Sequence, residues 1–144
     1  MDTLHLRIQL THPQAVLPRV SQPGDVAADV SACVPCVIPP GGRALVETGL
    51  VLELPEGFRA RLHSRSGLSL KYGIEVGAGL IDQGFRHPLK VLLYNLGADP
   101  FAIAPGDRVA QLCIERYTHP TFEAVSAVAE TGRSEGWGSS GLRA

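Results

Sequence analysis

The sequence lacks long apolar runs and an excess of charge of one sign. No stretch of about 18 apolar residues occurs, and the amino terminus has no charged region followed by an apolar one. The net charge is −1 at pH 7, and the 13 basic residues form no stripe along the chain. A membrane span, a secretory leader and a face for long nucleic-acid duplexes are therefore not expected. We expect a soluble, cytoplasmic protein.

Cysteine is scarce as well. Cys33 and Cys36 form a CxxC motif, and Cys113 is the only other cysteine. A structural zinc site usually needs four ligands, and neither a second CxxC nor an HxxxH pattern is present to complete one. A redox CxxC belongs at a strand-to-helix turn, whereas this motif lies in a segment without helical pattern. The motif therefore predicts inert, reduced thiols.

Glycine and proline, by contrast, are abundant and divide the chain into short segments. The 144 residues include 16 glycines and 11 prolines, which favours short strands and tight turns over long helices. One domain with one core is expected at this length. A short helix is expected over residues 68–72, ending at Gly73. We predict strands over residues 4–10, 26–34, 44–46, 51–54, 58–63, 89–95, 101–103 and 108–116. In the first of these strands, one buried face is expected from Leu4, Leu6, Ile8 and Leu10.

The stretch from Gly77 to Asn95 is the strongest candidate for a functional site. It begins Gly-Ala-Gly, which lets backbone approach a ligand closely. Asp82 follows the apolar pair Leu80–Ile81 and precedes a Gln83–Gly84 turn, where a loop meets a strand. Such loops often carry chemically active groups. The alternative interpretation is a hairpin whose aspartate only caps the turn.

Polar residues on other segments have chemistry suited to an anion. Arg65, Ser66 and Gly67 offer a guanidinium, a hydroxyl and an open backbone N–H in succession, and the arginine fork suits phosphate oxygens. Gln111 lies among apolar neighbours in its strand and needs a polar partner. Asp29 is placed similarly, either as a buried cap or as an anion near a cation. Considered alone, the Arg65 segment can equally be a solvated surface loop.

The composition changes after Val128. The segment ETGRSEGWGSSG, residues 130–141, is rich in glycine and serine around Trp137, the only tryptophan. Such a segment cannot build a core of its own and should be mobile. Its backbone N–H groups, hydroxyls and indole ring can all serve as contacts to a ligand.

The order of these segments resembles a known family. AADVSA around Asp29, Arg65 to Leu68, GLID to Phe85–Arg86, GDRVAQL around Gln111 and the GWGSSG tail resemble the five motifs of the trimeric deoxyuridine triphosphatases (dUTPases). The resemblance implies an all-β fold, a jelly-roll-like antiparallel β-barrel with one short helix and a flexible carboxy-terminal arm. It further implies a barrel domain over residues 1–128, an arm over residues 129–144 that closes the active site, and a homotrimer with shared active sites.

The resemblance also implies a reaction and a role for each site residue. The reaction is hydrolysis of dUTP to dUMP and pyrophosphate with Mg²⁺, in which Asp82 activates the water that attacks the α-phosphate. Asp29 would hold a water on the Mg²⁺. Phosphate contacts would come from Arg65, Ser66, Gly67 and Gln111, and from Arg133, Gly138, Ser139 and Ser140 of the arm. Nucleoside contacts would come from Gly79, Leu80, Phe85, Lys90 and Trp137, with Phe85 under the deoxyribose and Trp137 stacked on uracil.

The chain departs from the family pattern at three places. The family commonly has tyrosine where this chain has Phe85, although a bare ring still excludes ribose by its size. The family also has glycine after the arginine of that motif, whereas His87–Pro88 follows here and stiffens the hairpin. In the tail, Gly132–Arg133 replaces the usual Arg-Gly order, and Trp137 replaces the usual phenylalanine.

Two alternatives come from other functional classes. The related deoxycytidine triphosphate deaminases share a hairpin of this type, but they need a catalytic glutamate where this chain has Leu92, and they lack a GWGSSG-type arm. A non-catalytic jelly-roll binding or assembly module is the second alternative. Asp82, Arg65 and Gln111 together argue against it, because an assembly module has no need of all three.

Overall fold

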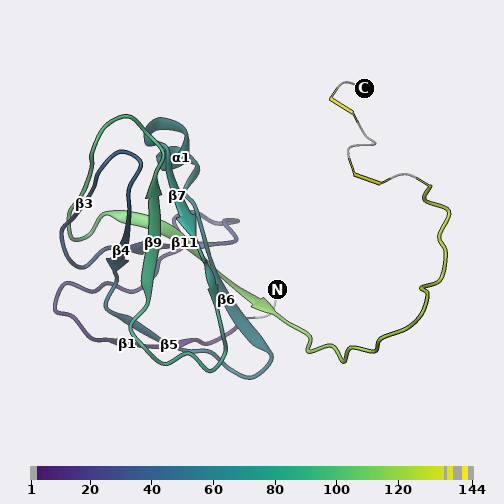
Figure 1. Cartoon of the computed structure of the whole chain (residues 1–144). Helices are drawn as coiled ribbons and strands as arrows, with labels where there is room; N and C mark the ends of the chain where they lie inside the picture. Colours follow the sequence, from purple (N-terminus) through teal and green to yellow (C-terminus); the bar gives the residue numbers. More distant parts are fainter. Residues whose placement is uncertain (1–2, 135, 138–140, 143–144) are drawn as a thin grey trace.

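The computed structural model describes residues 3–134, 136–137 and 141–142, and it is built almost entirely of β-strands with one short helix, α1 (Ser66–Tyr72) (Figure 1). The strands are β1 (Arg7–Leu10), β2 (Ala28–Ser31), β3 (Cys36–Ile38), β4 (Arg43–Glu47), β5 (Leu50–Glu53), β6 (Phe58–His63), β7 (Ile74–Gly77), β8 (Leu80–Ile81), β9 (Lys90–Asn95), β10 (Phe101–Ile103) and β11 (Arg108–Arg116).

All strand pairs are antiparallel. The largest sheet has the order β2-β11-β6-β8, and a second sheet has the order β4-β9-β7. Two further pairs, β1-β5 and β10-β3, complete the described hydrogen-bonded ladders. Strands distant in sequence are thus neighbours in space, as in β2 with β11. This all-β antiparallel arrangement agrees with the jelly-roll expectation.

The core lies between these sheets and consists of aliphatic side chains. Thr48 and Asn95 are the polar exceptions, and both are fully buried. Thr48 donates its hydroxyl hydrogen to the Leu89 carbonyl at 2.6 Å, and the Asn95 amide donates to the carbonyls of Ile38 and Asp99 at 2.9 and 2.8 Å. Their polar groups are therefore satisfied inside the core. The largest fully buried aliphatic residues are Ile38, Leu50, Leu52, Leu54, Ile74, Leu93, Val30, Val46, Val91 and Val109.

Most predicted elements are confirmed, with shifted bounds. The predicted helix ends at Gly73, which adopts a left-handed conformation with φ 68° and closes the last turn. Strands β3, β7 and β8 were not predicted from the sequence. The buried face expected for residues 4–10 was wrong: the strand begins at Arg7, Leu4 and Leu10 are exposed, and only Leu6 and Ile8 pack against the core.

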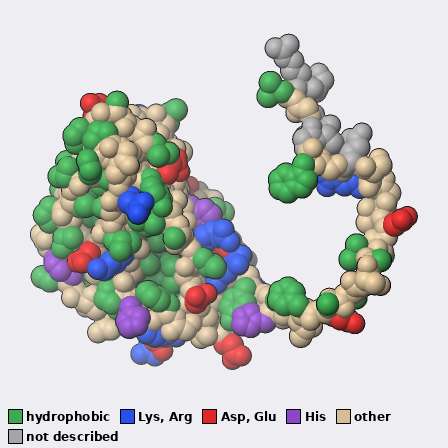
Figure 2. Space-filling view, viewed as in Figure 1, with side chains coloured by type: hydrophobic (Ala, Val, Ile, Leu, Met, Phe, Trp, Pro, Cys, Tyr) green, Lys and Arg blue, Asp and Glu red, His purple; other side chains and the backbone are tan. Residues whose placement is uncertain are grey.

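The predicted tail lies apart from the body of the chain. After β11 the described residues 118–134 are all exposed and form neither helix nor strand. Figures 1 and 2 show this segment running away from the packed sheets. Within the described ranges, no helix has the length and apolar character needed to cross a membrane.

The CxxC motif spans a loop and the start of β3. Cys33 is buried, Cys36 is half-buried, and both are free thiols, as is Cys113. Burial and the neighbouring Glu47 charge raise the pKa of the Cys33 thiol. Burial and the charge of Glu115 raise the pKa of Cys113 likewise. Raised pKa values disfavour the reactive thiolate.

Candidate active site

The loop between β8 and β9 borders a cavity of about 390 Å³. Leu80 and Asp82 line one part of it, and Phe85, Pro88 and Lys90 line another. The turn is closed by the Phe85 N–H, which donates to the Asp82 carbonyl at 3.1 Å. The Asp82 side chain is exposed at the edge of the cavity. The hairpin therefore presents an apolar pocket with one carboxylate at its margin.

The glycines before Asp82 have a structural reason to be glycine. A Cβ at Gly79 would collide with the backbone carbonyl of Leu62 in β6, and a Cβ at Gly77 would collide with the Tyr94 ring. Gly79 also accepts a hydrogen bond from the Leu62 N–H at 2.8 Å. Close packing against β6 and β9 thus requires these glycines, whether or not a ligand approaches.

Lys90 is already engaged in an ion pair. Its ammonium lies 3.1 Å from the Glu47 carboxylate, and both side chains are about half exposed. The pair joins neighbouring strands, since Glu47 and Lys90 are register partners in β4 and β9. Lys90 lines the cavity beside Pro88, but its charge is balanced within the chain.

Asp29 forms the centre of a second polar cluster. Its side chain is 9% exposed, with Oδ1 3.3 Å from Arg65 Nε and Oδ2 3.0 Å from Arg108 Nη1. Ser21 donates its hydroxyl hydrogen to Oδ2 at 2.7 Å. Arg65 is held further by a hydrogen bond from Nη1 to the Arg108 carbonyl at 2.9 Å.

The charges in this cluster leave an excess of positive charge. Burial alone raises the pKa of Asp29, but the hydrogen bonds from Ser21 and Arg108 and the charges of Arg65 and Arg108 outweigh it and hold that pKa below 3.8. Asp29 is therefore ionised, and one carboxylate balances only one of the two guanidinium groups. The surplus charge suits an anion such as phosphate.

Gln111 stands beside this cluster in the sheet. It is the register partner of Asp29 on β2 and of His63 on β6. It is half-buried, and its side-chain amide forms no hydrogen bond within the part of the chain that the structure describes. The amide is therefore available to a ligand, in keeping with its predicted need for a polar partner.

The start of α1 is fixed by an acidic residue of the next strand. Glu75 accepts hydrogen bonds from the hydroxyls of Ser64 and Ser69, and these bonds lower its pKa. The Ser64 hydroxyl also accepts a hydrogen bond from the Val76 N–H at 2.8 Å. Ser66 and Gly67, which lie between the two serines, are exposed to solvent.

The structure separates the predicted site residues into two groups. Asp29, Gln111 and Arg65 lie together, whereas Asp82 and Phe85 lie with the hairpin. Asp29 lies on the edge strand β2, and Asp82 follows β8 at the other edge of the sheet β2-β11-β6-β8. Arg65 follows the end of β6, whereas Asp82 lies near its start, because Ile81 is the register partner of Ala60. We call the two groups the phosphate half-site and the hairpin half-site. One chain does not bring them together.

The predicted arm residues form a third group. Arg133 and Trp137 belong to the exposed tail and do not line the hairpin cavity. The backbone N–H of Arg133 donates to the Thr131 hydroxyl at 3.3 Å, and the Trp137 ring is fully exposed. Gly138, Ser139 and Ser140 lie outside the described residues.

Comparison with known proteins decides the family. The sequence model of the dUTPase family matches residues 14–141. The chain belongs to the dUTPase family. It is 40% identical to a deoxyuridine 5'-triphosphate nucleotidohydrolase of Solibacter usitatus, covering 96% of this chain and 97% of that protein. A rice protein of the same name is 41% identical over 95% of this chain and 81% of its own length.

A solved dUTPase structure has the same fold. A point mutant of the Staphylococcus bacteriophage 80alpha dUTPase, solved with dUpNHpp, superposes with a TM-score of 0.85 at 26% identity, covering 97% of this chain and all of that one. The antiparallel sheets of this chain therefore match the fold of a solved dUTPase.

Three residues in or beside the phosphate half-site were not singled out from the sequence. Arg108 was considered only as part of GDRVAQL, and Ser21 was placed in a crossing loop. That loop pairs with β2 through Arg19 and Asp29, which brings Ser21 to the carboxylate. Glu75 gave no signal in the sequence because its serine partners are 6 and 11 residues away.

Proposed function

We propose that this chain hydrolyses dUTP to dUMP and pyrophosphate. The observation that carries the proposal is the hairpin cavity with Asp82 at its edge and Phe85 in its wall. The curated relatives named deoxyuridine 5'-triphosphate nucleotidohydrolase support the substrate.

Asp82 is the general base of the proposed reaction. Its carboxylate orients a water molecule and takes the proton as the water oxygen bonds to the α-phosphorus. The bond between the α-phosphorus and the α–β bridging oxygen breaks, and pyrophosphate leaves with that electron pair. The exposed position of Asp82 at the cavity edge is compatible with access to water.

The phosphate half-site binds the triphosphate. Arg65 supplies charge, the Ser66 hydroxyl and Gly67 N–H supply neutral donors, and the Gln111 amide orients a phosphate or the water. Arg108 adds the second guanidinium, which the Asp29 carboxylate leaves only partly balanced. The combination favours a multiply charged substrate over a nucleoside.

The residues of the phosphate half-site fit Mg²⁺, the cofactor proposed for this reaction. Asp29 Oδ1 forms an ion pair with Arg65 Nε at 3.3 Å but accepts no hydrogen bond, so it has capacity for one from a metal-bound water. The described residues contain no cluster of three metal-ligating side chains. Such a cluster is not required, because Mg²⁺ bound to a triphosphate keeps several of its waters. When bound, the ion withdraws charge from the phosphate oxygens.

The hairpin half-site selects the nucleoside. The backbone at Gly79 and Leu80 reads the uracil edge, and the Phe85 ring lies under the deoxyribose, where a 2′-hydroxyl has no room. Lys90 faces the substrate from the same cavity but is paired with Glu47. Its contribution to binding is therefore smaller than that of an unpaired lysine.

A homotrimer completes the site. The two half-sites lie apart on one sheet, so the hairpin of one copy serves the phosphate half-site of another. The arm, residues 129–144, crosses to a formed site and closes it: Trp137 stacks on uracil, while Arg133, Gly138, Ser139 and Ser140 contact the γ-phosphate. The exposed course of residues 118–134 away from the body supports this arrangement. Free thiols support a cytoplasmic location.

A pyrophosphate-release assay across the deoxynucleoside triphosphates with Mg²⁺ tests the proposal. We expect turnover of dUTP far above that of the other deoxynucleoside triphosphates and of UTP. Ammonia release from dCTP would favour the deaminase alternative, despite Leu92 at the glutamate position. No turnover of any nucleotide would favour the binding module.

A further inference from the structure

The position of Asp82 depends on the backbone of its turn. Within the described part of the chain its carboxylate forms neither a hydrogen bond nor an ion pair. The neighbouring Phe85 is 39% exposed, and its ring packs edge-on against the His87 ring, with the two ring centroids 5.6 Å apart. Contacts of their own side chains therefore do little to fix the two groups, and the turn from Asp82 to Phe85 must be held from outside.

Arg86 supplies that support. Its Nη1 donates to the carbonyls of Gln83 and Phe85, at 2.6 and 3.0 Å. Its Nη2 reaches the Leu54 carbonyl, just after β5, at 3.4 Å. One guanidinium thus binds two carbonyls of the turn, a task for which a planar fork of donors is suited. Together with the Gln83 side-chain amide, which donates to the same Leu54 carbonyl at 3.4 Å, it connects the turn to the residue after β5.

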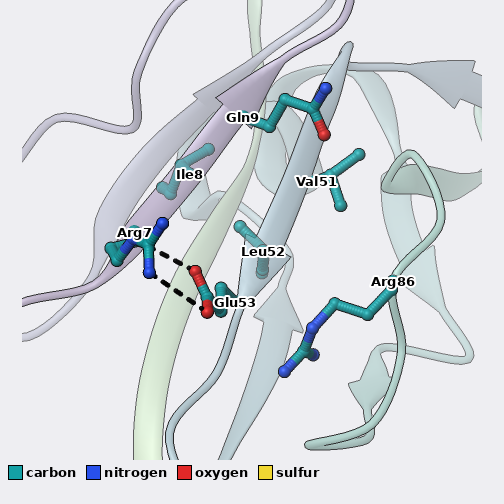
Figure 3. A pocket seen from close by; sticks show the side chains of 7 residues that line it. All are labelled: Arg7, Ile8, Gln9, Val51, Leu52, Glu53 and Arg86. Carbon is teal, nitrogen blue, oxygen red and sulfur yellow. Dashed lines mark hydrogen bonds and ion pairs between the residues drawn. The ribbon is translucent and has the colours of Figure 1, made fainter.

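The surroundings of Arg86 argue against an ordinary ion-pair role. Arg86 extends toward β5 beside a second cavity of about 470 Å³ (Figure 3). Glu53 is the carboxylate lining that cavity, and it is paired with Arg7 at 3.2 Å. No carboxylate of the described residues lies within 4.0 Å of the Arg86 guanidinium. Its hydrogen-bond partners are carbonyl oxygens, all but one from the hairpin turn itself.

We propose that Arg86 is a positioning residue that sets both the reactivity of Asp82 and the deoxyribose selectivity of Phe85. Arg86 touches no reacting atom; it fixes the two carbonyls between which the turn bends. This inference rests on the proposed function. It goes further because it assigns both catalytic geometry and sugar discrimination to a residue that faces away from the substrate cavity.

The test compares Arg86→Ala, Arg86→Lys and Arg7→Ala. Arg7→Ala is the matched control, because it removes a guanidinium from the same cavity without touching the turn. We expect Arg86→Ala to lower kcat/KM for dUTP on the order of 10²-fold, as a misplacement of about 1 Å does. Its preference for dUTP over UTP should fall about tenfold. Arg86→Lys should be intermediate, because an ammonium lacks the planar fork.

Binding of non-hydrolysable dUTP and UTP analogues, measured by calorimetry, separates the two hypotheses. A parent protein without dUTP turnover refutes the proposed function, and the analogue affinity ratio then decides the Arg86 proposal alone. If Arg86→Ala and Arg86→Lys only lower the thermal midpoint, and turnover and the dUTP:UTP ratio match Arg7→Ala, Arg86 is a structural residue and the inference is overturned.

Discussion

Two aspartates of the proposed site occupy opposite environments. Asp82 is exposed at a cavity edge, whereas Asp29 is buried between two guanidinium groups and a serine hydroxyl. A carboxylate held by three donors is poorly placed to accept a further proton, since its charged form is the stabilised one. The exposed carboxylate is the better base, and the buried one is better suited to holding the two guanidinium groups in place.

Replacing Asp82 by asparagine should remove the base and keep the fold. We expect turnover of dUTP to fall by about 10²–10⁴-fold, the usual contribution of general-base catalysis, while analogue binding changes little. Steady-state kinetics and calorimetry measure the two effects. Asp99→Asn, an exposed carboxylate outside the cavity, is the control. An Asp82→Asn protein with near-parental turnover would contradict the mechanism.

Replacing Asp29 by asparagine should change how stability depends on pH. The pKa of Asp29 is lower in the folded state than its usual value of 3.8, so the unfolded chain binds the proton more tightly. The stabilisation is therefore present above pH 3.8 and is lost as the pH falls through the folded-state pKa. At pH 7 we expect Asp29→Asn to lose about 1–3 kcal/mol in the free energy of unfolding.

Urea unfolding at pH 7 and at pH 3 measures the Asp29 effect. The difference between parent and Asp29→Asn should shrink at the lower pH, because below pH 3.8 the unfolded parent gains a proton at Asp29 and becomes more stable relative to the folded form. Asp25→Asn, which alters an exposed turn cap, should show a smaller difference at pH 7. An equal difference at both pH values would show that the charge of Asp29 does not stabilise the fold.

At the scale of elements, α1 is a short helix whose start is fixed by Glu75. A Glu75→Gln variant keeps the shape but offers one acceptor oxygen instead of two to Ser64 and Ser69. We expect KM for dUTP to rise about three- to tenfold with kcat nearly unchanged, because the phosphate contacts of Ser66 and Gly67 loosen. Glu53→Gln, far from α1, is the control. An unchanged KM would separate Glu75 from phosphate binding.

Local patterns in the sequence predicted elements well where one residue type determines the geometry. Gly73 ends the helix. Residues 23–25 and 105–107 both have the turn sequence Pro-Gly-Asp, and Asp25 and Asp107 accept hydrogen bonds that close these turns. β8 was not predicted because it has only two residues, with glycine just before it. The separation of Asp29 from the hairpin was not predicted for a different reason: it depends on the order of strands in the sheet, which residue spacing along the sequence does not encode.

At the scale of the whole molecule, the arm is proposed to close on the triphosphate. Stacking Trp137 on a base contributes about 1–3 kcal/mol, and ordering the arm opposes this by roughly 1 kcal/mol or more per residue. Phosphate contacts must supply the rest, so closure should follow the triphosphate. Trp137 fluorescence should change with a non-hydrolysable dUTP analogue and Mg²⁺, and change little with dUMP. Equal responses, or none, would exclude a triphosphate-dependent lid.

The division of the site into two half-sites has a genetic consequence. If each site joins the phosphate half-site of one copy to the hairpin of another, two defective chains can restore activity together. Asp29→Asn and Asp82→Asn chains, unfolded together in equal amounts and refolded, should regain about a quarter of the parental sites. Light scattering should give a trimer mass for the mixture. Activity equal to the mean of the separate variants would place both half-sites of each site on one chain. In a cell with two alleles, such a pair would complement.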